Sequence, residues 1–425
     1  MFAQRPRAAI VVTGSELVRG ERTDLNGPFL ARELLSLGFE PARILIVGDR
    51  PDELEVALRE GLEAELCAIT GGLGPTHDDR TVELLAAAAG VELILDPGLE
   101  AEIEAVSRGF AERMRRPYAD FAPGVRKQAT LPAGGISLGL AGTAPGIVLE
   151  TAGTVVIVLP GPPAELQRLW PRALETEPLR RMLERASSPG RRVLRFFGAS
   201  ESAVARGLAD AGGDGDGVEA TICARDFEIH VDLLVEPGAE ARAEKLASGL
   251  RAPLERYLFS EDERPIEEVV LELCRAQGLS LVTAESSTGG LVSARLTSVP
   301  GSSDVFRGAV VAYANEVKVS ELGVPEELLQ SYGAVSAQAA AAMATGARAR
   351  LDADVAISVT GIAGPGGGTP EKPVGLVFLH VETPDASEGI EFSYPGDRES
   401  IRRRAAVAGL HLARRLLTQA RDEPV

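Results

Sequence analysis

The chain of 425 residues has few of the residues that would cross-link it or hold it in a membrane. Its three cysteines, Cys67, Cys223 and Cys274, are odd in number, scattered, and without CxxC spacing. This pattern argues against a disulfide framework and a zinc site, and we expect small core residues there. No apolar run approaches the roughly 20 residues that span a bilayer, and residues 1–6 lead into an apolar segment without the hydrophobic stretch of a signal peptide. We therefore expect a cytoplasmic protein.

Positive charge is also scarce. The chain has 44 Lys and Arg against 62 Asp and Glu, a formal net charge of −18. It therefore lacks the basic footprint of nucleic-acid-binding proteins, and we expect neither nucleic acid nor a membrane as its partner. An anionic ligand would have to meet local donors, such as the arginines at 402–404, or a bound metal.

Aromatic residues make up only 4% of the chain, whereas small and aliphatic residues are abundant. This composition is typical of helices packed on sheets. At roughly 150 residues per domain, the length predicts two or three α/β domains.

The first part of the chain alternates between two periodicities. Short apolar runs at 8–14, 43–48 and 65–71 predict strands, and helical spacing at 24–38 and 52–62 predicts helices between them. Strands that alternate with helices form a mostly parallel sheet, which binds ligands at the carboxyl ends of its strands.

A glycine-rich loop follows the third predicted strand. Gly71, Gly72 and Gly74 allow the backbone to approach a phosphate, and Asp78 and Asp79 offer hard oxygen ligands to a divalent cation. These groups suit metal-assisted attack on a phosphoanhydride. The alternative is a tight turn in which Asp79 caps a helix over 81–88.

Later loops around a predicted strand at 154–158 add two cations. Arg126 and Lys127 are suited to meeting phosphate oxygens, and the loops at 142–146 and 159–163 are rich in Gly and Pro. The segment 162–165 is equally consistent with an ordinary helix start that has Pro in its first turn.

The middle of the chain carries no recognisable chemistry. Strands are predicted at 192–197 and 227–235, and the acidic loop at 211–217 lacks the spacing of a calcium loop, which favours a solvated turn. An acidic, proline-containing stretch at 260–265 marks the next boundary.

A second candidate site follows a predicted helix at 266–277 and a predicted strand at 280–284. The segment 284–290 reads AESSTGG and precedes a helix that starts near Leu291, so backbone N–H groups at this helix start are free to hold an oxyanion or a phosphate. The alternative is that Ser286, Ser287 or Thr288 caps the helix.

A lysine lies downstream of this segment. Lys318 follows a predicted strand at 309–312 and a loop-like stretch at 315–316. A lysine kept neutral by burial can take a proton from a serine hydroxyl, although an exposed lysine is the ordinary alternative. A glycine-rich loop over 361–368 suits a phosphate or a ribose, or is a flexible turn.

In its first 170 residues or so the chain resembles the N-terminal domain of the CinA family of competence/damage-inducible proteins, on the motifs at 71–79, 126–129, 142–146 and 159–165. The resemblance implies a molybdopterin-binding-like fold and a metal-dependent ADP-ribose pyrophosphatase site. Three positions depart from the family pattern: Ser15, Leu25 and Gly139.

The last 160 residues or so closely resemble the CinA C-terminal domain, a nicotinamide mononucleotide deamidase. The shared motifs are AESSTGG, VPGSSDVF, YANEVK, YGAVS, SVTGIAGPGGGTPEKPVG and YPGDRESIRRRA. The resemblance implies that Ser286 is the nucleophile, Lys318 its base and Tyr313 their support. Residues implied at the substrate are Thr288, Gly289, Gly290, Asn315, Thr360, Gly361, Gly364, Arg398 and Arg402. Ser287 stands where a Cys is frequent, which excludes a cysteine nucleophile in this motif.

Together these patterns predict an α/β protein with a doubly wound molybdopterin-binding-like domain at 1–170, a small α/β connector at 171–260 and a deamidase domain at 261–425. We expect hydrolysis of nicotinamide mononucleotide to nicotinate mononucleotide and ammonia. We also expect a pyrophosphatase site that needs a divalent metal, no cofactor at the deamidase site, and a homodimer. Two other hypotheses remain open: a non-catalytic regulator of competence or DNA damage, and a molybdopterin-handling transferase.

Overall fold

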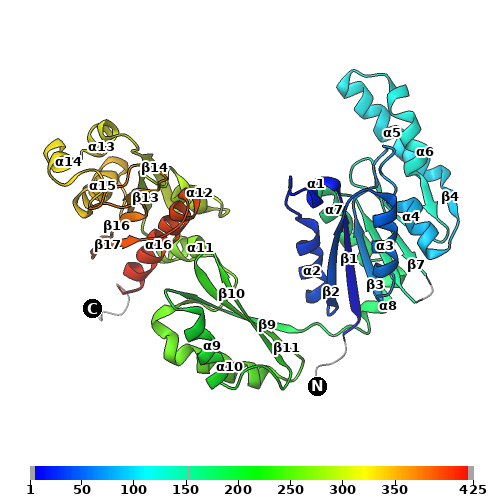
Figure 1. Cartoon of the computed structure of the whole chain (residues 1–425), viewed down its shortest axis with the longest axis horizontal. Coiled ribbons are helices and arrows are strands. Elements are labelled where there is room, and N and C mark those ends of the chain that lie inside the picture. The colour runs from blue at the N-terminus through cyan, green and yellow to red at the C-terminus, as the bar shows by residue number, and fades with distance from the viewer. Residues whose placement is uncertain (1–4, 152, 420–425) are drawn as a thin grey trace. The chain divides into compact units, whose positions relative to one another are not determined.

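The computed structural model describes residues 5–151 and 153–419 (Figure 1). Contacts divide the chain into two compact units, residues 1–190 with 235–240, and residues 191–234 with 241–425. The predicted connector at 171–260 is therefore shared between the units. The first residues of the chain, which we expect to lack a signal peptide, lie partly outside the described residues.

The first unit contains a six-stranded sheet, in which the first four strands are parallel, the fifth is antiparallel to the fourth and the sixth is antiparallel to the fifth. In sheet order the strands are β2 (Glu40–Val47), β1 (Arg7–Thr13), β3 (Leu66–Thr70), β8 (Val155–Leu159), β7 (Pro145–Glu150) and β6 (Ile136–Leu140). A separate ribbon pairs β4 (Leu93–Leu95) with β5 (Thr130–Pro132). The prediction of a mostly parallel, doubly wound sheet is confirmed for this part of the chain.

Helices cover both faces of this sheet (Figure 1). One apolar core packs β1, β3 and β8 against α2 (Asn26–Ser36), α7 (Pro163–Leu174) and α8 (Glu177–Leu183). The other packs them against α3 (Pro51–Gly61), α4 (Thr81–Ala89), α5 (Pro97–Met114) and α6 (Ala122–Gln128). The remaining short helices of this unit are α1 (Ser15–Val18) and the 3₁₀ turn Tyr118–Asp120.

The second unit contains two sheets. A four-stranded sheet has the order β10 (Val218–Arg225), β11 (Glu228–Val235), β9 (Gly190–Phe197) and β12 (Leu258–Ser260), with α9 (Glu201–Asp210) and α10 (Glu240–Leu254). A five-stranded sheet has the order β14 (Phe306–Val311), β13 (Leu281–Glu285), β15 (Val355–Gly361), β16 (Leu376–Glu382) and β17 (Ser387–Ser393). The strands β13, β14 and β15 are parallel, whereas β16 is antiparallel to β15 and β17 is antiparallel to β16.

Helices also lie on both faces of the five-stranded sheet. One core contains residues of α11 (Ile266–Gln277), α12 (Leu291–Thr297) and α16 (Arg398–Gln419). The other contains residues of α13 (Asn315–Leu322), α14 (Glu326–Tyr332) and α15 (Ala337–Leu351). Because β13 lies between β14 and β15, the chain that leaves its carboxyl end emerges between two parallel neighbours. Open α/β sheets bind their ligands at such carboxyl ends.

Two sequence expectations need correction or comment at the level of the fold. Cys67 and Cys274 are buried core residues, and burial raises the pKa of each thiol to about 12. Cys223, however, is exposed on β10, so the expectation of three core cysteines is wrong at that position. Among the helices that the structure describes, none combines the length and the apolar character that a membrane crossing requires.

Candidate active site

Ser286 lies at the carboxyl end of β13, where the strand turns toward α12. Its N–H donates to Val359 O of β15 at 2.9 Å, which continues the sheet by one residue. The turn then passes through Gly289 (φ 61°) and Gly290 (φ 95°), a left-handed backbone that favours glycine. Ser286 is nearly buried, at 8% exposure. The turn therefore fixes one hydroxyl at the edge of the sheet.

Lys318 meets this hydroxyl. Its Nζ lies 3.2 Å from Ser286 Oγ and also donates to Ala312 O at 2.8 Å and to Tyr313 O at 3.2 Å. The side chain is only 1% exposed, so the alternative of an ordinary surface lysine is wrong. Burial lowers the pKa of Lys318, and the nearby Glu316 partly opposes that shift.

The stretch around Lys318 is helical, which corrects the prediction of a loop at 315–316. The helix α13 begins at Asn315, and its fourth residue is Lys318. The predicted role of Asn315 at the substrate stays a prediction. Only Lys318 and Leu322 are buried in this helix. The sequence shows no apolar stripe because the buried face carries a lysine.

The start of α12 differs from both predictions made for it. Its N-cap is Gly290, and none of Ser286, Ser287 and Thr288 caps it with a side chain. The Glu285 carboxylate instead accepts hydrogen bonds from the N–H groups of Gly290, Val292 and Ser293, at 2.9, 3.1 and 2.8 Å. The expectation that the amides at this helix start are free for a ligand is therefore wrong for Gly290, Val292 and Ser293.

Two other amides in the turn are free. Within the part of the chain that the structure describes, neither Ser287 N–H nor Thr288 N–H has a hydrogen-bond acceptor, and Thr288 Oγ1 is buried without a partner. Buried donors without acceptors are rare in folded proteins. The donors available to an anion beside Ser286 thus belong to the turn.

The arginines at the start of α16 hold the loops around the site. Arg398 donates to Gly364 O at 2.7 Å and to the Tyr313 hydroxyl at 2.9 Å, and Arg402 donates to Thr288 O at 2.7 Å. Tyr313 is 60% exposed, and its backbone carbonyl accepts from Lys318. Either of these arginines was expected to meet the substrate, and both have protein acceptors in this structure.

The end of β15 completes the surroundings. Thr360 is buried and its hydroxyl donates to Ala334 O at 2.7 Å, which ties the loop after α14 to the site. Gly361 leaves no room for a side chain, because a Cβ there would lie 2.7 Å from Leu376 O. Gly364 has φ 80°, where a Cβ would lie 2.6 Å from a Val374 methyl group. These glycines are required by the backbone itself.

In the first unit the glycine loop approaches the strands closely. Gly71 has φ 103° and donates its N–H to Leu159 O at 3.1 Å, and a Cβ there would lie 2.4 Å from Thr13 O. Gly72 has φ 64°, and a Cβ there would lie 2.2 Å from Thr81 Oγ1. Gly74 packs on the Asp79 carboxylate in the same way.

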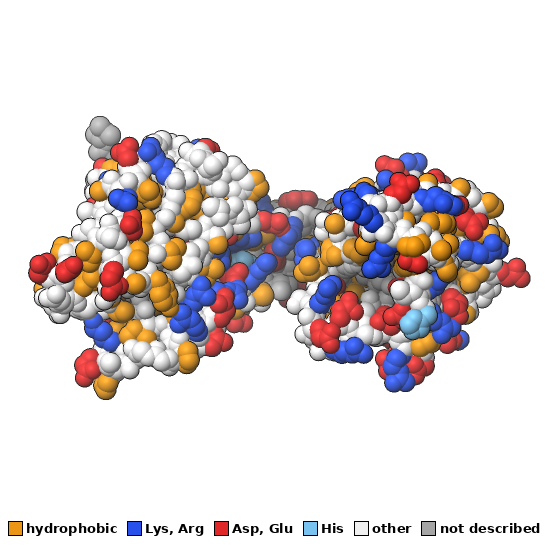
Figure 2. Space-filling model, turned by 90° about the horizontal axis from the view of Figure 1, so that it is seen from above, with side chains coloured by type: hydrophobic (Ala, Val, Ile, Leu, Met, Phe, Trp, Pro, Cys, Tyr) orange, Lys and Arg blue, Asp and Glu red, His pale blue; other side chains and the backbone are white. Residues whose placement is uncertain are grey.

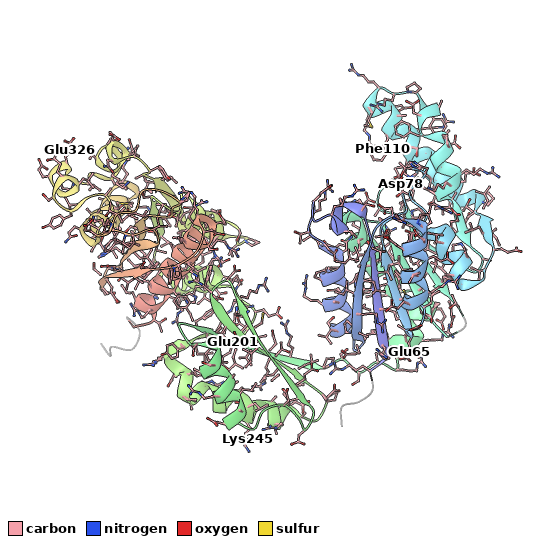
Figure 3. All side chains as sticks on the ribbon, in the orientation of Figure 1. Glu65, Asp78, Phe110, Glu201, Lys245 and Glu326 are labelled. Atoms are coloured by element: carbon pink, nitrogen blue, oxygen red, sulfur yellow. The ribbon has the colours of Figure 1, made fainter. Side chains whose placement is uncertain are left out.

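Asp78 and Asp79 lie on one side of that loop. Both carboxylates contact the Thr76 hydroxyl, and Asp79 also accepts from Thr76 N–H at 2.9 Å. The Thr76 hydrogen bond lowers the pKa of Asp78. Asp79 does not cap α4, whose N-cap is Arg80 without a side-chain cap, so the capping part of that alternative is wrong. Figure 3 shows Asp78 at one end of the sheet and Glu65 at the opposite end.

A cavity of about 250 Å³ adjoins this loop and is lined by Gly72, Gly74, Asp79 and Lys127 among others. Lys127 Nζ donates to Thr76 O. Arg126 is exposed and lies 4.0 Å from Glu100, and it does not line this cavity. The loop 159–163 leads directly into α7, as an ordinary helix start would.

The described residues supply only part of the ligand set that a divalent cation needs. Within residues 5–151 and 153–419, no group of three or more His, Cys, Asp or Glu side chains is placed to hold a metal ion. Asp78 and Asp79 supply two carboxylates that converge on one hydroxyl. They fit a hard cation that completes its shell with water or with ligand oxygens.

Sequence reasoning missed two features. Glu285 could have been found as a charged residue that ends an apolar strand. A second cavity, of about 430 Å³, lies at the carboxyl ends of β1, β3 and β8. Its polar lining comes mainly from Thr13, Glu16, Arg22, Asp24, Asn26 and Thr70.

Comparison with known proteins finds a family match in each half of the chain. Residues 263–417 match the model of the CinA C-terminal domain, and residues 9–179 match the model of a probable molybdopterin binding domain. A CinA-like protein of Mycolicibacterium paratuberculosis is 44% identical over 97% of this chain and 99% of its own length. A CinA-like protein of Mycobacterium tuberculosis is 42% identical over the full length of both chains.

The crystal structure of the competence/damage inducible protein CihA from Agrobacterium tumefaciens is 41% identical and covers 38% of this chain and 100% of its own, with a TM-score of 0.35. The two full-length relatives and the two domain models agree on the assignment. The chain therefore belongs to the CinA family, with an N-terminal molybdopterin-binding-like domain and a C-terminal CinA domain.

Proposed function

We propose that the C-terminal site hydrolyses the carboxamide of nicotinamide mononucleotide to nicotinate mononucleotide and ammonia. The observation that carries the proposal is the 3.2 Å contact between Ser286 Oγ and the Nζ of the buried Lys318. A serine hydroxyl needs a base, and a lysine amine whose pKa is lowered by burial is a competent one. The resemblance to the family's deamidase motifs supplies the substrate.

The reaction proceeds through an ester of Ser286. Neutral Lys318 takes the hydroxyl proton while Ser286 Oγ bonds to the carboxamide carbon, which gives a tetrahedral oxyanion. The carbon–nitrogen bond then breaks, and Lys318 returns the proton to the leaving nitrogen, which departs as ammonia. Water attacks the ester with Lys318 again as base, and the Ser286 oxygen leaves with the proton. One amide and one water become one carboxylic acid and one ammonia.

We expect the developing oxyanion to be bound by the free turn amides. The N–H of the residue after a nucleophile is a common oxyanion donor, and in this chain that residue is Ser287. Loss of one such donor typically costs roughly 3 kcal/mol of transition-state stabilisation. Tyr313, whose hydroxyl contacts Arg398, is exposed and would offer its ring to the substrate.

A second activity is proposed for the first unit: hydrolysis of ADP-ribose by one water to AMP and ribose 5-phosphate with a divalent cation. The observation in its favour is that Asp79 and Lys127 share a cavity with Gly72 and Gly74, with Asp78 alongside. Asp78 and Asp79 would hold the cation, which neutralises phosphate charge and polarises the phosphorus–oxygen bond. Lys127 would meet a phosphate oxygen, and the glycines let the backbone approach it closely.

The alternative of a nucleic-acid-binding regulator finds little support on the surface. On the face that Figure 2 shows, acidic and basic side chains are interspersed on each unit and form no continuous basic area. With a net charge of −18, this surface does not favour a polyanion.

The experiment is an assay of ammonia and AMP with each substrate, with and without EDTA. We expect ammonia release from nicotinamide mononucleotide to survive EDTA, and AMP release from ADP-ribose to be lost in EDTA and in Asp78→Ala. Ammonia release that needs a metal, or that persists in Ser286→Ala, would refute the dyad mechanism. AMP release unaffected by EDTA would refute the second proposal.

A further inference from the structure

Glu285 is a fully buried carboxylate that directly precedes the nucleophile. It is the last residue of β13 and has 0% exposure. No Lys, Arg or His forms an ion pair with it anywhere in the described chain, residues 5–151 and 153–419. A buried charge without a counterion is costly unless neutral donors surround it. Its surroundings therefore need an explanation.

Five donors surround this carboxylate, and three of them are backbone amides at the start of α12. Oε2 accepts from Gly290 N–H and Val292 N–H, and Oε1 accepts from Ser293 N–H. The hydroxyl of Ser293 also donates to Oε1, and the Thr283 hydroxyl lies 3.4 Å from it. A carboxylate at a helix N-terminus is stabilised by the helix dipole as well as by these bonds. The charge is thus stabilised by α12 itself.

Glu285 connects the two ends of the turn that carries the nucleophile. Glu285 at the end of β13 holds the first turn of α12, and residues 286–289 span the gap between them. Since the amides of Gly290, Val292 and Ser293 are already occupied, an anion beside Ser286 finds, among the described residues of this turn, the N–H groups of Ser287 and Thr288 free.

We propose that Glu285 is a positioning residue of the amidase site: it holds the turn 286–289 in place and leaves the Ser287 and Thr288 amides as the oxyanion donors. The proposal rests on the proposed function of Ser286 as a nucleophile. It assigns to Glu285 no contact with the substrate and no proton transfer.

The test is Glu285→Gln in the full-length chain. Glutamine has the same shape but only one acceptor oxygen, and its NH₂ group would face backbone N–H donors. Part of the hydrogen bonding between residue 285 and the start of α12 would therefore be lost. The matched control is Glu267→Gln. Glu267 is also buried and contacts the same helix, through Arg295 at 2.9 Å, but is not part of the turn.

Two readouts are taken on both variants. The first is kcat and KM for nicotinamide mononucleotide, with the concentration of folded sites determined separately. The second is the rate at which a fluorophosphonate labels Ser286: Oγ bonds to phosphorus, fluoride leaves, and the hydroxyl proton passes to Lys318. This second readout needs the nucleophile and the oxyanion donors but no nicotinamide, so it tests Glu285 even if the proposed substrate is wrong.

For Glu285→Gln we expect a fall of about 100-fold or more in kcat and in the labelling rate per folded site, with KM within about threefold. The acid limb of the pH profile, which reports Lys318, should not move. Glu267→Gln should keep both rates within about threefold of wild type. Unchanged rates in Glu285→Gln, or an equal loss in the control, would overturn the proposal.

A shift of the acid limb in Glu285→Gln would also overturn it, because Glu285 would then act on the Lys318 pKa. If Glu285→Gln does not fold, replacing the Ser287 amide by an ester removes that N–H and keeps every side chain. The same loss of about 100-fold in labelling is expected, and an unchanged labelling rate would exclude Ser287 as a donor.

Discussion

At the scale of single residues, the buried amine of Lys318 combines a cost in stability with a use in catalysis. Burial disfavours its charged form, so its pKa in the folded chain lies below the ordinary 10.5. The unfolded chain then binds more protons than the folded one between the two pKa values, and stability rises with pH across that window. The same shift provides a neutral base at a lower pH than an exposed lysine would.

The first prediction follows from this shift. The kcat/KM for deamidation should rise with pH through an acid limb whose pKa lies below 10.5, because only the neutral amine accepts the serine proton. Lys318→Arg should lose activity at every pH, since a guanidinium stays protonated. Initial rates over a pH series measure both. An acid limb unchanged in Lys318→Arg would show that another group titrates.

Among residues, sequence found the nucleophile and its base but not the group that places them. Ser286 and Lys318 belong to short motifs that resemble a known family, so they are visible without a structure. Glu285 is visible only as a charge at the end of an apolar strand. Its partners at 290, 292 and 293 become its neighbours only after the chain turns.

At the scale of elements, the packing of α13 against α15 decides where Lys318 lies. Gly346 of α15 faces the end of α13, where a Cβ would lie 1.8 Å from Leu322 O. Backbone cannot retreat as a flexible side chain can, so no residue larger than glycine fits there without moving α13.

The second prediction is that Gly346→Ala destabilises the second unit by about 2 kcal/mol and lowers kcat, because it displaces the helix that carries Lys318. The control is Gly109→Ala in α5, where nothing lies within 4 Å of the new Cβ and the gain in helix propensity should stabilise by about 0.5–1 kcal/mol. Denaturant unfolding and steady-state kinetics measure both. A Gly346→Ala variant as stable and active as wild type would contradict this packing.

Elements with a clear apolar period were predictable, and the exceptions have physical causes. The strands β1 and β3 are almost entirely buried, and their apolar runs reveal them directly. The predicted helix over 24–38 begins only at Asn26. Asp24 lies before its first turn, and the Asp24 carboxylate accepts from Asn26 N–H and Gly27 N–H at the start of the helix. In α13 the buried lysine hides the periodicity.

At the scale of the whole molecule, a buried acid–imidazole network joins α16 to the four-stranded sheet of the second unit. His411 of α16 stacks on Phe197 of β9 at 3.8 Å, and its Nε2 lies 2.8 Å from the carboxylate of Glu228 on β11. His230 contacts the other oxygen of Glu228 at 3.0 Å. Burial lowers the pKa of His411 to about 4, although the carboxylate opposes the shift.

The third prediction concerns stability and pH. Because His411 stays neutral in the folded chain while the unfolded chain binds a proton near 6.5, stability is full above pH 6.5 and falls as the pH drops toward 4, by about 3 kcal/mol at most. His411→Phe should remove most of this pH dependence, whereas His77→Gln, at a fully exposed histidine, should keep it. Denaturant unfolding between pH 5 and 7.5 measures the slope. A slope that persists in His411→Phe would assign the effect to other groups.

Domain organisation was partly readable from the sequence. Motifs locate the two ends of the chain, but residues 235–240 belong with the first unit, and Arg5 pairs with Glu236 across 231 positions. Composition cannot reveal such a pair, because each partner is an ordinary charged residue until the fold buries both.

The central claim, that Ser286 and Lys318 act as one unit in amide hydrolysis, is tested most directly by kcat/KM of Ser286→Ala, Lys318→Ala and the double variant. If the two groups act as one unit, removing either one removes the effect of both. Each single change should therefore lower kcat/KM by at least about 1,000-fold, and the double variant should lower it no further than either single variant. Losses that multiply in the double variant, or a wild-type rate in either single variant, would contradict the account.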